Sequence, residues 1–128
     1  MPSAIPATPE FETRDTAIVA RPSDVQSLLE LLTDADCRAI LTATTDEALT
    51  AREVSEDVDL PLSTTYRKLE ALTDAGFLAE GTRFDSDGSH PSQYRRAVAD
   101  VVVSVAADGA ALTVVRRSQV RETQDSGR

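Results

Sequence analysis

The sequence predicts an α+β fold in which about four helices are followed by a two-stranded β-hairpin and a second, C-terminal β-hairpin. Apolar residues recur with helical spacing from residue 25 to residue 72. Beyond them lie two pairs of extended segments, each joined by an Asp-Gly turn, at Asp87-Gly88 and Asp108-Gly109. The first pair spans residues 77–98, and the second lies within residues 100–117.

Two short amphipathic helices are expected first. In the first, apolar residues repeat at i, i+3, i+4 and i+7 and form a stripe along one face. A shorter apolar stripe follows Thr33 and Asp34, either of which can cap a helix. The stripes comprise Val25, Leu28, Leu29 and Leu32, then Cys37, Ile40 and Leu41.

Residues 50–78 have the pattern of a helix-turn-helix. The sequence Thr50-Ala-Arg-Glu53 is a capping box, which starts a helix. Asp59-Leu60-Pro61 ends it, because proline lacks an amide donor and pushes its predecessor out of helical geometry. A longer helix, 62–75, then leads to Gly76, which provides a left-handed exit.

Helix 62–75 is expected to bury one face and to present hydrogen-bonding groups on the other. At 100° per residue from Thr65, the outward side comprises Ser63, Thr64, Tyr66, Arg67 and Glu70, with Arg67 central. Such a surface suits a DNA groove. Lys68 lies nearer the core, so we expect its amine to meet a phosphate at most.

The hairpin 77–98 resembles a wing beside that helix. Arg83, His90, Arg95 and Arg96 cluster on it, where they are suited to hold a DNA backbone. The alternative for the arginines is pairing with nearby acidic residues. Val101-Val102-Val103 predicts a strand covered on both faces, either extending the domain's own sheet or forming a dimer interface with the N-terminal helix.

These patterns divide the chain into four parts. We expect a disordered tail with four prolines (1–22), a winged helix-turn-helix domain (23–99), a β-hairpin extension (100–117) and a flexible tail (118–128).

The net charge of −9 is unevenly distributed. Residues 1–60 hold 13 acidic and 4 basic side chains and so carry all of it (4 − 13 = −9), whereas the rest of the chain is balanced. Basic residues are twelve arginines and one lysine. This composition is similar to that of proteins from organisms that live at high salt. At molar salt the Debye length is about 3 Å, so binding depends on contacts at short range rather than on net charge. The alternative is an ordinary acidic protein.

Several classes are not expected. No apolar run approaches the roughly 20 residues needed to cross a bilayer, and the first residues lack a signal-peptide pattern, so we expect a soluble, cytoplasmic protein.

One cysteine and one histidine give neither a disulfide nor a zinc site. No catalytic or phosphate-binding motif occurs, so we expect no enzyme and no cofactor. Cys37 is expected in the core, with redox sensing as the alternative.

Residues 31–97 resemble the ArsR-like winged-helix regulators, and most closely the small ones of halophilic archaea, through LLTDADCRAIL, REVSEDVDLPLSTTYRKLEALTDAGFL and QYRR. The resemblance implies a DNA-binding regulator, commonly a homodimer on double-stranded DNA, with Ser63, Thr64, Tyr66 and Arg67 in the major groove and Arg83, Arg95 and Arg96 on the backbone. The sequence departs from the family at Ser55 (usually alanine) and Asp59 (usually glycine). Thr50 and Arg52 replace the paired cysteines of metal sensors, so metal sensing is not implied. The alternative function is a winged-helix protein-protein interaction module that does not bind DNA.

Overall fold

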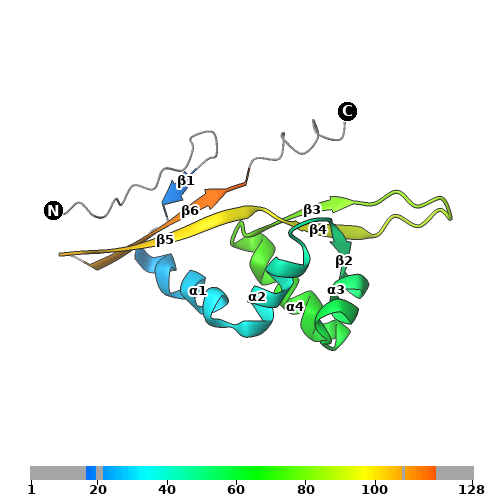
Figure 1. Ribbon diagram of the computed structural model, residues 1–128, viewed down its shortest axis with the longest axis horizontal. Helices are drawn as coiled ribbons and strands as arrows, with labels where there is room; N and C mark the ends of the chain where they lie inside the picture. The colour runs from blue at the N-terminus through cyan, green and yellow to red at the C-terminus, as the bar shows by residue number, and fades with distance from the viewer. Residues whose placement is uncertain (1–16, 20–21, 108, 118–128) are drawn as a thin grey trace.

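The computed structural model describes residues 17–19, 22–107 and 109–117 and has four helices and antiparallel strands (Figure 1). The helices are α1 (Pro22–Thr33), α2 (Ala35–Ala43), α3 (Ala51–Val58) and α4 (Leu62–Asp74). The strands are β1 (Ala17–Val19), β2 (Leu49–Thr50), β3 (Leu78–Thr82), β4 (Ser92–Arg96), β5 (Val98–Ala106) and β6 (Gly109–Arg116). The predicted α+β winged helix-turn-helix with a C-terminal hairpin is confirmed.

Local signals begin and end the helices as predicted. Thr50 and Glu53 form the capping box of α3, with each side chain bonded to the other residue's backbone N–H. Asp34 proves to be the N-cap of α2 and accepts a hydrogen bond from the Asp36 amide. Asp59 leaves α3 in the left-handed conformation at φ 59°, and Gly76 follows α4 at φ 85°.

The strands form two three-stranded antiparallel sheets, ordered β2-β4-β3 and β1-β6-β5. In the first, which we call the wing sheet, Leu78 lies opposite Arg96 and Thr82 opposite Ser92. The wing (β3, β4 and the loop between them) and the β5–β6 hairpin extend from the helices in opposite directions (Figure 1). Strand β2 was not predicted, because two residues are too short to show a period.

One core joins the helices to the strands. The apolar stripes of α1 and α2 face it, and α1 contacts β6. Its fully buried side chains include Ile40, Leu69, Leu72, Phe77 and Leu112, which come from α2, α4, the exit of α4 and β6. Because α4 is anchored by two of them, its opposite face has a defined direction.

Two expectations are wrong. Residues 1–22 were expected to be disordered, but Ala17–Val19 pairs with β6, whose edge would otherwise leave backbone groups unpaired, and Pro22 starts α1. The rest of that tail, and the expected flexible tail 118–128, lie outside the described residues. The valine run is not covered on both faces: Val103 is 45% and Val105 87% exposed, because the hairpin extends beyond the helices.

Candidate nucleic-acid interface

The outer face of α4 presents the polar residues that the sequence placed there. Thr65, Leu69 and Leu72 are fully buried, and Thr65 Oγ1 donates to the Pro61 carbonyl at 3.0 Å. On the other side Ser63 and Arg67 are exposed, and so is Tyr66 at 53%. Thr64 is half-buried and Glu70 is exposed. The outward orientation therefore agrees with the helical geometry.

Arg67 and Lys68 are adjacent in sequence but differ in environment. The Arg67 side chain makes no hydrogen bond or ion pair within the part of the chain that the structure describes. Lys68 instead forms an ion pair with the Asp34 carboxylate at the start of α2. The hydrogen bond to Asp34 raises the pKa of Lys68, and the amine is directed to α2 rather than to an external phosphate.

Asp34 also accepts a hydrogen bond from the Cys37 thiol, with Sγ and Oδ2 at 3.3 Å. Cys37 is 1% exposed, as its place in the apolar stripe predicts. Burial, followed by the bond to Asp34, raises the pKa of the thiol to about 11. A thiol in this state is protonated at neutral pH and is a poor nucleophile.

Arg83 and Arg96 on the wing are bonded to groups inside the protein. The Arg83 guanidinium binds the Glu53 carboxylate through two contacts, of 2.9 and 3.0 Å. Arg96 donates to the carbonyls of Val98 and Ala99 and to Thr45 Oγ1, and burial lowers its pKa. Arg95 lies half-buried on β4. The predicted phosphate contacts of Arg83 and Arg96 would each require these bonds to be replaced.

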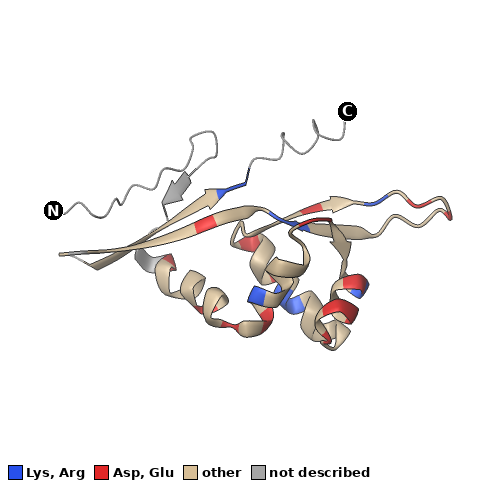
Figure 2. Ribbon diagram, viewed as in Figure 1, with Lys and Arg blue, Asp and Glu red and all other residues tan. Residues whose placement is uncertain are grey.

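The loop of the wing between β3 and β4 is acidic at its end (Figure 2). It carries Asp85 and Asp87, and a backbone hydrogen bond from Ser89 lowers the pKa of Asp87. His90 lies on the same loop, exposed, with its ring edge-on to Phe84 at a centroid distance of 5.0 Å. Phe84 is 76% exposed. This loop combines negative charge with an aromatic surface, which does not favour contact with phosphates.

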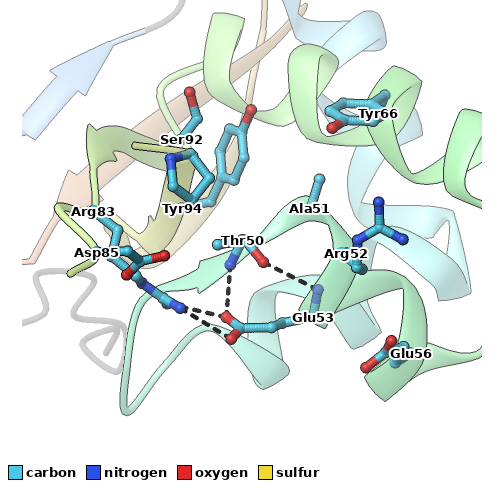
Figure 3. Close-up of a pocket in the computed structure, with 11 residues that line it drawn as sticks. Thr50, Ala51, Arg52, Glu53, Glu56, Tyr66, Arg83, Asp85, Ser92 and Tyr94 are labelled. Carbon is cyan, nitrogen blue, oxygen red and sulfur yellow. Dashed lines mark hydrogen bonds and ion pairs between the residues drawn. The ribbon is translucent and has the colours of Figure 1, made fainter. Parts of the chain in front are cut away.

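A cleft of about 440 Å³ lies between the start of α3, the N-terminal half of α4 and the wing (Figure 3). Its polar lining includes Arg52, Glu53, Glu56, Tyr66 and Arg83. Arg52 was not predicted as a contact from the sequence, although its side chain is exposed beside α4 and makes no ion pair among the described residues. The role of Glu53 beyond the capping box was missed as well.

Ser55 and Asp59 shape the turn between α3 and α4. Ser55 Oγ donates to the Leu60 carbonyl at 2.6 Å, and the Leu60 amide returns a bond to the Ser55 carbonyl at 3.0 Å. Alanine at position 55 has no hydroxyl for the first bond. Asp59 adopts the left-handed conformation that glycine would provide.

Within the described ranges, no group of three or more histidine, cysteine, aspartate or glutamate side chains is placed to hold a metal ion. The same residues include no helix that is both long and apolar enough to cross a membrane.

Comparison with known proteins supports the helix-turn-helix. Residues 32–80, from α1 to β3, match a family model described as a helix-turn-helix domain, so the chain carries such a domain. No curated protein gives a significant match. A solved structure described as a possible transcriptional regulator from Methanosarcina mazei Go1 is 21% identical, with a TM-score of 0.46. The match covers 58% of this chain and 63% of that one, and a likeness at this level does not bear on function.

Proposed function

We propose that the protein is a sequence-specific, DNA-binding transcriptional regulator of the ArsR-like type that inserts α4 into the major groove. The observation that carries the proposal is the outer face of α4, where Ser63, Tyr66 and Arg67 are exposed opposite a buried apolar face. Arg67 has both donor edges available for guanine, since no described residue binds it. Arg52, at the start of α3, is a further candidate for a phosphate contact.

We further propose that two copies act together as a homodimer. Two recognition helices would then lie one duplex turn apart, about 34 Å, on a palindromic or pseudo-palindromic site. The wing is assigned a smaller part than the sequence suggested, because Arg83 and Arg96 are bonded within the protein and the wing loop carries Asp85 and Asp87. The acidic composition supports the further proposal that this binding takes place in a high-salt cytoplasm, where contacts at short range dominate.

The test is selection of bound duplexes from a random-sequence pool in molar potassium chloride, followed by titration of the selected duplex. Arg67→Ala should weaken specific binding roughly 5-fold to 150-fold, the equivalent of about 1–3 kcal/mol for a bidentate guanine contact, while the melting temperature stays unchanged. The matched control is Arg116→Ala, which removes the same charge from β6. Equal affinity of the Arg67 variant and the wild type would show that α4 does not recognise DNA through this residue.

A second candidate function is protein docking without DNA, and the wing loop favours it. Phe84 is exposed on a loop that carries two aspartates, a combination suited to a basic partner surface with an apolar pocket. If the folded wild-type protein enriches no duplex from the pool, the docking function is favoured. Phe84→Ser should then abolish capture of that partner and leave the fold intact.

A further inference from the structure

The Arg83–Glu53 pair joins the wing to the helix-turn-helix. Arg83 directly follows β3, and its guanidinium reaches the first turn of α3 (Figure 3). Nη1 lies 2.9 Å from Glu53 Oε2, and Nη2 lies 3.0 Å from Oε1. This two-point geometry fixes the orientation of both groups more strictly than a single contact does.

The same guanidinium has two further acceptors. Nη2 donates to the Ala48 carbonyl at 3.1 Å, just before β2, and Nε donates to Gln93 Oε1 at 3.1 Å on β4. Glu53 is equally engaged, because Oε1 also accepts the Thr50 amide at 2.9 Å in the capping box. One side chain therefore connects the end of β3, β4, the approach to β2 and α3.

We propose that Arg83 and Glu53 are positioning residues that set the angle of the wing relative to α4, and that Arg83 is not a phosphate contact. The proposal rests on the proposed DNA-binding function. If Arg83 turned to a phosphate, the Glu53 carboxylate would remain in a cleft that also holds Glu56 and Asp85, without its cation. Repulsion among these acids and from the DNA opposes that exchange.

The Glu53→Gln variant distinguishes a positioning role from a simple charge effect, because the two predict opposite changes in DNA affinity. Glutamine at this helical position preserves the capping box but removes the charge that Arg83 binds. Loss of a negative charge near DNA should by itself tighten binding. Loss of wing positioning should weaken it. The matched control is Glu56→Gln, which removes an equal charge from the same helix and the same cleft, and Glu56 has no partner among the described residues.

The experiment measures affinity for the duplex selected by the wild-type protein, over a series of potassium chloride concentrations. We expect Glu53→Gln to weaken binding roughly twofold to fivefold and Glu56→Gln to leave it unchanged or tighter. Arg83→Gln should weaken binding by a similar factor, and the double variant should be no worse than either single one. The slope of log affinity against log salt should stay the same in all variants.

Two results would overturn the proposal: tighter binding by Glu53→Gln, or a slope reduced by about 0.9 in Arg83→Gln, the signature of one lost phosphate contact. If the wild-type protein selects no duplex at all, the proposed function fails instead. In that case, amide hydrogen exchange tests whether Glu53 and Arg83 position the wing, independently of DNA binding. Faster exchange across β3 and β4 in Glu53→Gln, relative to Glu56→Gln, supports the role, and equal exchange refutes it.

Discussion

Asp34 shows how one carboxylate serves several parts of this small domain. It caps α2, accepts the Cys37 thiol and binds the Lys68 amine on α4. The contact between Asp34 and Lys68 holds α4 against α2, on the side of α4 that adjoins its outer face. The Lys68 amine, which was expected to meet a phosphate at most, therefore helps to orient the helix that carries Arg67.

The Asp34–Lys68 pair predicts a pH dependence of stability. The hydrogen bond from Lys68 is the largest cause that lowers the pKa of Asp34 from 3.8. A folded-state pKa below the unfolded one stabilises the fold above about pH 4, and this contribution is lost as the pH falls through the folded-state value. Asp34→Asn should therefore cost about 1 kcal/mol at pH 7 and less at pH 3, measured by urea unfolding.

The control for this change is Asp36→Asn in the first turn of the same helix, because the Asp36 side chain makes no ion pair with a described residue. It should lower the free energy of unfolding less at pH 7. If both variants lost the same stability at both pH values, the ion pair would contribute nothing measurable.

Cys37 should be unreactive in the folded protein. Its thiol is buried and its pKa is raised to about 11, so the thiolate is scarce at pH 8. Reaction with a disulfide reagent should proceed only through unfolding and should accelerate with urea as the unfolded fraction rises. Cys37→Ser should show the same response of DNA binding to peroxide as the wild type. Rapid modification of the native protein would revive the redox-sensing alternative.

At the scale of elements, the turn between α3 and α4 fixes the angle at which α4 begins. Its left-handed residue is Asp59, where L side chains pay a steric cost that glycine avoids. The Ser55 hydroxyl compensates by bonding the Leu60 carbonyl across the turn. Ser55 and Asp59 therefore act on the same turn.

Asp59→Gly should raise the free energy of unfolding by about 0.5–1 kcal/mol, because the strain at φ 59° is relieved. The matched change Glu56→Gly, inside α3, should lower it by about 0.5 kcal/mol through lost helix propensity. Thermal unfolding in molar salt distinguishes the two signs. Destabilisation by both variants would mean that the Asp59 side chain stabilises the fold by more than its left-handed backbone conformation destabilises it.

At the scale of the whole molecule, the β5–β6 hairpin leaves an apolar surface without cover. Val103 and Val105 lie on one face of β5, at i and i+2, and both are exposed. Residues 101–106 of this strand contain no charged side chain, although the chain carries −9 overall. An uncharged apolar face of this kind is suited to packing against a second copy.

If the homodimer uses this surface, Val105→Lys should convert it to a monomer in sedimentation velocity at molar potassium chloride and should weaken operator binding. Ser104→Lys places the same charge on the other face of β5 and should remain dimeric. A dimeric Val105→Lys protein would place the interface elsewhere, with α1 as the alternative element.

Much of the fold was predictable from short stretches of sequence. The capping box at Thr50, the break at Asp59 to Pro61 and the exit at Gly76 depend on neighbouring residues, so they appear in the structure where the sequence placed them. The outward side of α4 followed from helical periodicity alone. Strands β1 and β2, of three and two residues, were missed because partner strands, rather than their own pattern, stabilise them.

By itself, the sequence determined the helix-turn-helix and the polar face that presents Arg67, because these depend on interactions within a few residues. Only the tertiary structure decided which basic side chains have partners inside the protein. Lys68 binds Asp34 across 34 positions, Arg83 binds Glu53 across 30, and Arg96 reaches Thr45 across 51. In a chain with 22 acidic residues, charge alone offers many candidate partners. The packing of α2, α3 and the wing around α4 selects the actual ones.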